Sequence, residues 1–572
     1  MAVGASLAGV RHRLALAACL LASLGAVTPV RAADPIMRLS DVRAGMTCKG
    51  LTVIRGTAIT EFDVEVVDVI RGDSAAPGAR LLVRVSGPAV DATGVGPGFS
   101  GSPIYCRGGD GVRRNAGAIS ESVGEFGNRV ALATPIEQIL EQSPEVPPSA
   151  SSAPALRRSA RRIATPLTVS GLSSPVRRRL ARAAKRAGRV VLAAPSGPLG
   201  GFPAQDLRPG SAISAGVAGG DLALGSVGTV AYRDGTAIWA FGHPIDAVGQ
   251  RALALQDAYV FAVINNPLGT EEAITTKLAV PGRTVGVFSN DGLNQIAGRL
   301  GAPPRTIRMR VNVRETGTGR AAGLVSDVSD ERDLELGSSL DLVGALAVSQ
   351  ATGQVLGSAP PRFSTDMCVR IRLRGRKRRL GFCDSYQEAF GPFDDLSAAF
   401  GQIDRFKFGR IVPTDVTVRM QVRRGVREAF VLSAAAPRRV RPGQRIRVRL
   451  RLRRRRGDRF SLSFPMRVPR SLRPGREVLT LRGVVPASLQ EASEDGIEIV
   501  RDDLEGGAGP DDRAGARSVP ELDAAIAELG APDGLRATFA SRGRGPVVLS
   551  RRGLMVRGKV QVGVRVLKRK VD

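Results

Sequence analysis

Histidine, tryptophan and aromatic residues in general are scarce in this chain. Its 572 residues include two histidines and one tryptophan, and aromatic residues make up 4%. Only His243 lies beyond the N-terminal segment, so a metal site built from several histidines is excluded. Few aromatic residues also leave few platforms on which the bases of a single-stranded nucleic acid could stack. We therefore expect no metal, no cofactor and no nucleic-acid partner.

Long apolar runs are missing beyond the first thirty or so residues. The N-terminus has a basic start at Arg11 and Arg13, an apolar run over 14–27 and a small-x-small pattern at 30–32. This is the arrangement of a secretory signal peptide, and the run is shorter than the about 20 residues that a membrane span needs. We predict that residues 1–32 are removed and that the rest is secreted or lies in the cell envelope, without a transmembrane anchor. The alternative is that the N-terminal segment is not cleaved and stays as a membrane anchor.

Cysteine is also rare, and its use agrees with export. Cys19 lies in the signal segment, which leaves Cys48, Cys106, Cys368 and Cys383. Four cysteines allow three pairings. We favour Cys48–Cys106 and Cys368–Cys383, because each pair then stays within one predicted domain. No Cys-x-x-Cys spacing occurs, so a zinc or redox site is not indicated.

Acidic residues are outnumbered by basic ones. The net charge is +30, and the first 32 residues hold three arginines and no acid, so the exported chain carries about +27. Such an excess attracts anionic partners, and an anionic cell-wall polymer is a candidate beside a protein or peptide substrate. In the densest basic row, 445–453, arginines alternate with aliphatic residues, which predicts a strand with its arginines in water. A uniformly arginine-rich surface is the alternative to a binding face.

Short aliphatic runs separated by glycine turns predict a mainly β protein. The turn at 233–235 predicts a hairpin from 228 to 241. We expect the following order: a signal peptide over 1–32, a half-domain over 33–142, a basic linker with a helix near 176–187 over 143–195, a second half-domain over 196–302, an accessory β domain over 303–435 and a β-sandwich-like domain over 436–572.

The hexapeptide GFSGSP at 98–103 has the form of a serine nucleophile turn. Gly98 and Gly101 can take positive φ and let the backbone approach a substrate without a Cβ atom in the way. Ser100 would then be the nucleophile, and the N–H groups of Gly98 and Ser100 would form an oxyanion hole. Ser102 would support the turn. A plain Gly-Ser turn between two strands is the alternative.

A serine nucleophile needs a base, and His243 is the one imidazole that remains after signal removal. It lies between Gly242 and Pro244 at the end of a predicted strand, where a side chain can project into a cleft. A neutral imidazole with an ordinary pKa of about 6.5 suits this role near neutral pH. A hydrogen-bonded turn residue is the alternative.

The segment around Ser100, here called the serine box, and the segment around His243, the histidine box, together resemble two motifs of the SpoIVB-type serine peptidases, the stage IV sporulation protein B family. The resemblance rests on GFSGSPIY at 98–105, AFGHP at 240–244 and the supporting pieces RAGM at 43–46, FDVEV at 62–66, TPIE at 134–137 and PGSA at 209–212. It covers roughly residues 36–300. It implies a chymotrypsin-like double β-barrel with the site between the barrels, Ser100 as nucleophile and His243 as base. The implied activity is that of a secreted serine endopeptidase acting on itself or on an envelope protein.

The chain departs from this family in two respects. The family's histidine box precedes its serine box, whereas here Ser100 precedes His243. The family's acid lies shortly upstream of the serine, where this chain has SGP at 86–88, and the candidate acids Asp91 and Asp246 lie off that position. Loss of the acid can cost about 10⁴ in turnover. The alternative to an active peptidase is therefore a catalytically degenerate fold that serves as an envelope binding scaffold.

Overall fold

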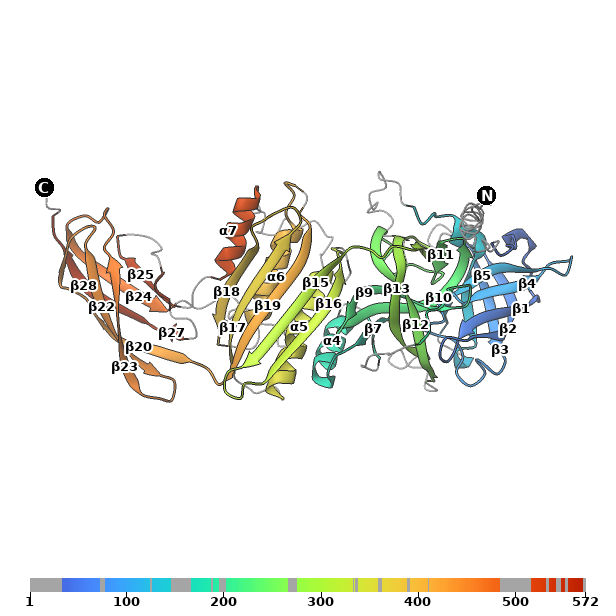
Figure 1. The fold of residues 1–572 in the computed structure, drawn as a ribbon, viewed down its shortest axis with the longest axis horizontal. Coiled ribbons are helices and arrows are strands. Elements are labelled where there is room, and N and C mark those ends of the chain that lie inside the picture. Colours follow the sequence, from blue (N-terminus) through green and yellow to red (C-terminus); the bar gives the residue numbers. More distant parts are fainter. Residues whose placement is uncertain are drawn as a thin grey trace, which may run out of the picture.

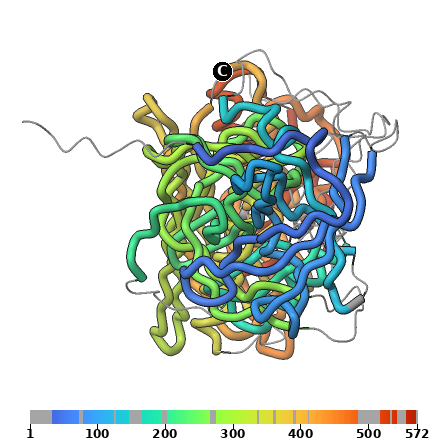
Figure 2. Tube along the Cα trace, turned by 90° about the vertical axis from the view of Figure 1, so that its right-hand side faces the viewer, coloured from blue at the N-terminus to red at the C-terminus, as the bar shows by residue number. Residues whose placement is uncertain are grey.

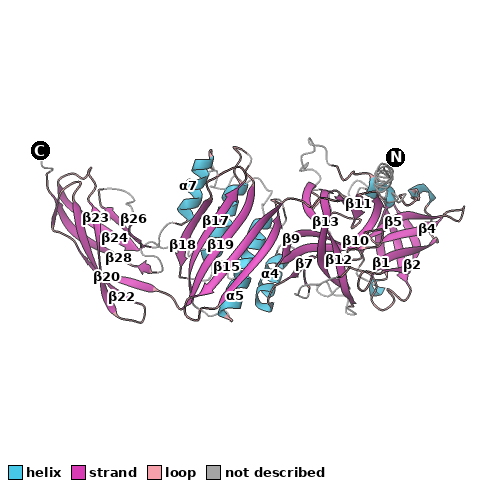
Figure 3. Cartoon of the chain, in the orientation of Figure 1, coloured by secondary structure: helices cyan, strands magenta, loops and turns pink. Residues whose placement is uncertain are grey.

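The structure is a computed structural model, and the described part of the chain is mainly β, as predicted. The β bodies follow one another along the long axis of the molecule, from a barrel near the N-terminus to a two-sheet body near the C-terminus (Figures 1 and 3). The predicted signal segment, residues 1–32, lies outside the described residues. These are 33–71, 78–123, 126–145, 166–186, 189–194, 202–265, 275–332, 334, 338–357, 363–387, 391–409, 411–483, 516–530, 534–541, 547–550 and 554–568.

A closed six-stranded barrel in the order β1-β2-β3-β6-β5-β4 occupies the first body. Alternate residues of its strands point inward, so that Leu81, Val83 and Val85 of β3 are fully buried. The disulfide Cys48–Cys106 joins β1 to β4 and is the pairing that we predicted. The elements are η1 (Leu39–Asp41), β1 (Thr47–Val53), β2 (Ile59–Ile70), β3 (Arg80–Ser86), β4 (Pro103–Arg107), β5 (Arg113–Ser122), η2 (Phe126–Asn128), β6 (Val130–Pro135) and α2 (Ile136–Leu140).

Six later strands pair in a second ring. Antiparallel pairing runs β9-β12-β13-β14-β11-β10, and β10 also pairs with β9, which closes the ring. The predicted hairpin from 228 to 241 is the β10–β11 pair. The strands are β9 (Ala212–Gly220), β10 (Ala223–Asp234), β11 (Ala237–Ala240), β12 (Gly249–Ile264), β13 (Thr276–Asp291) and β14 (Ile296–Leu300).

The second ring is part of a larger sheet rather than an isolated barrel. β10 pairs with β7 (Leu167–Ser170), which pairs with β8 (Val191–Ala193), and β9 pairs with β16, so that 13 strands are continuous. The predicted basic helix is α4 (Ser174–Arg186), whose apolar side chains pack into the core of this sheet. Its arginines face outward, because only one stripe of the helix meets the core.

The barrel and the second ring are in direct contact. Gly56 and Val260 exchange backbone hydrogen bonds of 2.6 and 3.0 Å between the two bodies. Val53 of β1 packs with Val260 and other small residues of the second ring, including Ala212 and Ala279. Seen from the barrel end, the blue strands of the barrel lie in front of the green second ring (Figure 2).

The next body differs from the accessory β domain that we predicted, because helices cover one face of its sheet. The sheet order is β18-β17-β19-β15-β16, with β15 parallel to β19. The disulfide Cys368–Cys383 joins the hairpin β17–β18, as predicted. The elements are β15 (Thr306–Glu315), β16 (Ala321–Ser329), α5 (Ser339–Leu356), β17 (Phe363–Leu373), β18 (Leu380–Tyr386), α6 (Gly391–Asp404) and β19 (Pro413–Arg424).

A third helix of this body comes from far along the chain. α7 (Val519–Leu529) falls within the region 436–572 that we assigned to the C-terminal domain, yet Leu522 and Ile526 are buried in the core of the middle body. The domain boundary that we predicted between residues 435 and 436 also differs from the structure, because β20 (Glu428–Ala435) pairs with β22 of the C-terminal body. Within the described residues, no helix is long and apolar enough to span a membrane.

The C-terminal body is built from two sheets. A four-stranded sheet, β23-β22-β20-β27, and a five-stranded sheet, β21-β28-β24-β25-β26, contribute to one apolar core. The predicted alternation in 445–453 is confirmed: Ile446, Val448, Leu450 and Leu452 are buried. The strands are β21 (Arg439–Val440), β22 (Arg445–Arg454), β23 (Arg459–Arg467), β24 (Gly475–Gly483), β25 (Gly534–Phe539), β26 (Val547–Ser550), β27 (Met555–Arg557) and β28 (Lys559–Val566).

Candidate functional site

The serine turn lies between β3 and β4 of the barrel, at its contact with the second ring. Gly98 has φ +93° and Gly101 has φ +88°, so both take the left-handed conformation that the sequence predicted. The Ser102 amide donates to the Phe99 carbonyl at 2.8 Å, and the Gly101 amide donates to the Ile119 carbonyl at 2.7 Å. The turn is therefore held by its own backbone and by β5.

Thr229 of β10 fixes the turn from the other side. Its amide donates to the Ser100 carbonyl at 2.7 Å, and its hydroxyl donates to the Gly98 carbonyl at 3.0 Å. A Cβ atom on Gly101 would lie 2.0 Å from the Thr229 carbonyl oxygen and 2.6 Å from the Phe241 amide nitrogen. Only glycine permits this approach, so the serine turn and the segment leading to His243 lie side by side.

Ser100 is the member of this turn that remains partly open to solvent. Gly98, Phe99, Gly101 and Ser102 are buried, whereas Ser100 is half-buried. The Gly98 and Ser100 amides, our predicted oxyanion donors, donate no hydrogen bond to any residue that the structure describes. Within the described part of the chain, these two backbone N–H groups therefore have no partner.

His243 lies just after β11 on a tightly folded loop. Phe241 and Gly242 both have positive φ, +68° and +66°. A bulky residue such as phenylalanine in this region is an uncommon, strained conformation of the kind found at functional sites. The ring of His243 is buried, 2% exposed, and packs edge-on to the Phe241 ring with centroids 5.9 Å apart.

The protonation of His243 follows from its one hydrogen-bond partner among the described residues, the Pro244 carbonyl. Nδ1 lies 2.7 Å from the Pro244 carbonyl oxygen, which only accepts, so Nδ1 carries the proton and Nε2 keeps its lone pair. Burial lowers the pKa of His243 to about 4, and the Arg80 and Arg189 guanidinium groups act in the same direction, against the Pro244 hydrogen bond. The ring is therefore a neutral acceptor above about pH 4.

The structure places Ser100 and His243 in adjoining loops without joining them. In the described part of the chain, no hydrogen bond connects the Ser100 hydroxyl to the His243 ring. The histidine loop is instead held against the barrel, since the Thr134 hydroxyl of β6 donates to the Gly242 carbonyl at 2.7 Å.

Neither candidate acid contacts the imidazole. The carboxylate of Asp91 accepts from the Gly87 amide at 3.0 Å and caps a surface turn. Asp246 is buried and forms ion pairs with Arg189 and Arg251. Both carboxylates are occupied by local partners, and the Pro244 carbonyl stands where an acid would orient the ring.

A buried ionic cluster anchors the histidine loop. Asp291 of β13 accepts from the Ile245 and Asp246 amides, each at 2.8 Å. Arg251 lies within 3.4 Å of Asp291 and 3.0 Å of Glu331, and its side chain is fully buried. The loop geometry is thus fixed by charges that do not touch the ring.

Lys277 of β13 is the residue at this site that sequence reasoning missed. It is fully buried beneath the serine turn, and its Nζ donates to Thr52 Oγ1 at 2.6 Å and to Thr229 Oγ1 at 3.3 Å. Its Nζ also lies 4.4 Å from the centre of the Phe99 ring. Burial lowers the pKa of Lys277 to about 7. The only sequence signal is a lysine two positions before Ala279, on the same inward face of an apolar strand.

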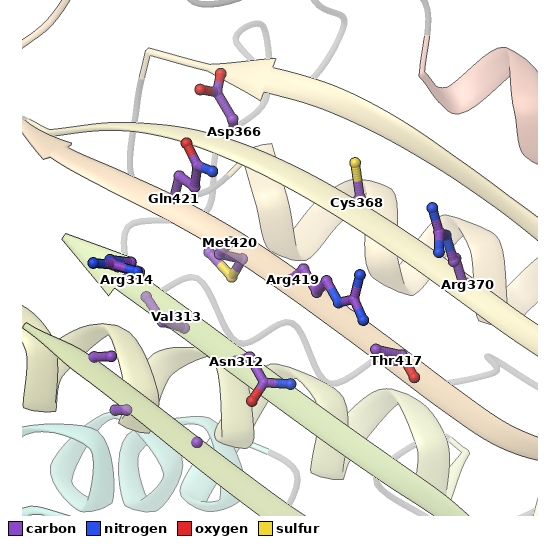
Figure 4. A pocket seen from close by; sticks show the side chains of 13 residues that line it. Asn312, Val313, Arg314, Asp366, Cys368, Arg370, Thr417, Arg419, Met420 and Gln421 are labelled. Atoms are coloured by element: carbon purple, nitrogen blue, oxygen red, sulfur yellow. The ribbon is translucent and has the colours of Figure 1, made fainter. Parts of the chain in front are cut away.

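A separate hollow lies on the open face of the middle sheet. It measures about 660 Å³, and Arg314, Arg370 and Arg419 project along it from β15, β17 and β19 (Figure 4). One acid, Asp366, also lines the hollow and pairs with the neighbouring Arg423 at 2.7 Å. The lining is therefore mixed in charge.

Among the described residues, no three histidine, cysteine or acidic side chains gather as a metal-ligand set. No family model, curated protein or solved structure matches the chain, and the resemblance to the sporulation peptidases therefore stays a prediction.

Proposed function

We propose that this chain is a serine hydrolase of the peptidase type, with Ser100 as its nucleophile. The observation that carries the proposal is the contact between the serine turn and the Phe241–Gly242 loop, where a Cβ on Gly101 would lie 2.6 Å from the Phe241 nitrogen. Two segments 140 positions apart are built to lie against each other. A plain Gly-Ser turn between two strands would not require such a close backbone contact.

The arrangement of the two bodies agrees with the proposal. A closed six-stranded barrel supplies the serine, and a six-stranded ring supplies the histidine. Two such barrels with a site between them are what the resemblance to the SpoIVB-type peptidases implies, and we propose that the second ring is the chymotrypsin-like partner barrel. The position of Ser100 before His243 in the chain is compatible with this proposal, because the residues of serine triads occur in several chain orders.

The chemistry would proceed at the half-buried hydroxyl. Ser100 Oγ attacks the carbonyl carbon of a peptide bond, its proton passes to His243 Nε2, and the oxygen of the tetrahedral intermediate is held by the Gly98 and Ser100 amides. The imidazolium then gives the proton to the leaving amine as the C–N bond breaks, which leaves an acyl ester on Ser100. Water, deprotonated by His243, hydrolyses this ester and restores the free hydroxyl. The Pro244 carbonyl fixes the tautomer that leaves Nε2 as acceptor, which is the positioning part of an acid's role.

The missing carboxylate limits the rate. A carbonyl dipole stabilises the imidazolium less than a full negative charge, and a base with a pKa of about 4 is weak. We therefore expect slow turnover, suited to cleavage of the chain itself or of one envelope protein. The two disulfides agree with an oxidising compartment, and export through residues 1–32 is part of the proposal.

Labelling with a fluorophosphonate probe tests the nucleophile. We expect the chain from residue 33 onward to be labelled on the peptide that contains Ser100, and Ser100→Ala to lose the label. Ser102→Ala serves as the matched variant, because its hydroxyl is buried and donates to Thr52 at 3.0 Å. Label that persists in Ser100→Ala, or that is found on Ser102, would contradict the proposal.

The second candidate is a binding scaffold on a degenerate peptidase fold. It is favoured by the buried His243 ring, which has no hydrogen bond to Ser100 among the described residues. This function predicts retention on cell-wall fractions that survives Ser100→Ala and weakens with salt. Retention that high salt leaves unchanged would count against it.

A further inference from the structure

On the outer face of the four-stranded C-terminal sheet, the strands β22 and β23 carry arginines and no acid, whereas Glu428 of β20 pairs with Arg455 and Arg557. We call this the arginine face. It is formed by the exposed arginines of β22 and β23: Arg445, Arg447, Arg449, Arg451, Arg453, Arg459 and Arg467. None of them forms an ion pair with a carboxylate of the described residues.

Repulsion between its arginines makes this face electrostatically unfavourable when no anion covers it. The strand register sets Arg445 opposite Arg467 and Arg453 opposite Arg459, and like charges in directly opposite positions destabilise a sheet. Between them, Arg449 and Arg451 lie opposite Ser463 and Ser461 of β23 and opposite Ala435 and Ser433 of β20, none of which is charged. The row on β22 repeats every two residues, about 7 Å, so its five charges repel one another along the strand. An anionic occupant would relieve this repulsion.

The chain itself contains a matching segment. Residues 484–515, which lie outside the described residues, hold nine acids and two arginines in a protein whose net charge is +30. The acids are Glu491, Glu494, Asp495, Glu498, Asp502, Asp503, Glu505, Asp511 and Asp512. No other stretch of the sequence opposes the overall charge so strongly.

The attachment point of this segment is close to the arginine face. The segment follows Gly483, whose amide donates to Gly558 at 2.9 Å beside β27. β27 pairs with β20, and β20 pairs with β22, where Phe430 lies opposite Arg453. The segment therefore leaves the sandwich two strands away from one end of the arginine row.

We propose that the arginine face is the docking surface for the acidic segment 484–515 of the same chain. The opposite charges match, and the 32 residues can extend to about 110 Å, far more than the row requires. A tether of this kind gives an effective concentration in the millimolar range, so an external polyanion would have to displace the segment. This inference is independent of the proposed hydrolase.

Binding of inorganic polyphosphate to the full chain tests the proposal at low ionic strength. One variant changes the nine acids of 484–515 to asparagine and glutamine. We expect it to bind labelled polyphosphate about tenfold more tightly than the unmodified chain, because the competing segment has lost its charge. High salt should abolish the gain.

Two arginine variants locate the effect. Arg447→Ser, Arg449→Ser and Arg451→Ser together should remove the gain when combined with the neutral segment. The matched control, Arg314→Ser, Arg370→Ser and Arg419→Ser, removes as many exposed arginines from the middle sheet and should keep it. Both sets are surface changes, and unchanged melting temperatures check that the fold is intact.

Two results would overturn the proposal. If the unmodified chain binds polyphosphate as tightly as the neutral-segment variant, the face is open to external polyanions and the segment does not dock there. If the gain survives the loss of Arg447, Arg449 and Arg451, the segment docks on another surface.

Discussion

Ser102 and Lys277 donate hydrogen bonds to the same atom, Thr52 Oγ1, at 3.0 and 2.6 Å. Ser102 belongs to the serine turn, Thr52 to the first strand of the barrel and Lys277 to the second ring. The shared oxygen therefore links three elements beneath Ser100. A buried amine without a carboxylate partner is costly, and groups of this kind concentrate at functional sites.

Replacing Lys277 with methionine should stabilise the protein, and more so at lower pH. Burial lowers the pKa of Lys277 from 10.5 to about 7, so between these values the unfolded chain binds more protons and stability rises with pH. The cost of the buried charge is full below about pH 7 and gone above about pH 10.5. Melting temperatures from pH 6 to 10 should show the Lys277→Met gain shrinking as pH rises.

The exposed Lys559 provides the control for this measurement. Lys559→Met should change the melting temperature little, since exposed surface changes are usually small. A gain for Lys277→Met that stays constant across the pH range would mean that the lysine has an ordinary pKa in the fold.

Gly101→Ala should destabilise the protein by about 2–4 kcal/mol, the sum of strain at φ +88° and overpacking against Thr229. The measurement is urea unfolding. Gly109→Ala is the comparison, because a Cβ atom there meets nothing within 4 Å, and it should stay within about 0.5 kcal/mol. Equal effects at the two glycines would show that the serine turn is not pressed against the second ring.

The rate of fluorophosphonate labelling should rise through about pH 4 and be flat above it. The base must be neutral to accept the proton of Ser100, and burial lowers the pKa of His243 to about 4. His243→Gln should be slow at every pH. Asp91→Asn should follow the unmodified chain, since Asp91 caps a surface turn. A midpoint near 6.5 would instead indicate an exposed ring with an ordinary pKa.

The two disulfides should contribute unequally to stability. The cysteines of the barrel pair are separated by 58 positions and those of the β17–β18 pair by 15. Loop-closure entropy then predicts losses of about 4 and about 3 kcal/mol on replacing each pair with alanine. Urea unfolding of Cys48→Ala/Cys106→Ala and of Cys368→Ala/Cys383→Ala measures the difference. A larger loss from the second pair would show that packing, rather than chain entropy, sets the order.

Local chemistry explains which parts of the fold could be read from the sequence. Gly98 and Gly101 were expected at positive φ because only glycine takes that conformation freely. The β22 strand followed from its strict alternation, and the hairpin β10–β11 followed from its turn residues. Each of these features depends on residues that are neighbours in sequence.

The helices of the middle body were missed for a physical reason. α5 is buried on nearly every side, so its apolar residues surround the helix and leave no polar face to mark its period. α7 has a readable N-cap at Ser518, but its place on the middle body depends on contacts with a core more than 100 positions earlier. Apolar sequence alone does not distinguish these elements from buried strands.

The sequence by itself determined the β character, the serine turn and the single candidate base, because these rest on residue type and short-range pattern. It favoured the disulfide pairing without deciding it, and the structure shows that pairing. Tertiary structure alone decided that the serine turn meets the Phe241 loop, that Lys277 lies beneath it and that Asp91 and Asp246 serve other partners. Those outcomes come from packing between strands that are distant in the chain, which burial and hydrogen bonding select and which no local pattern records.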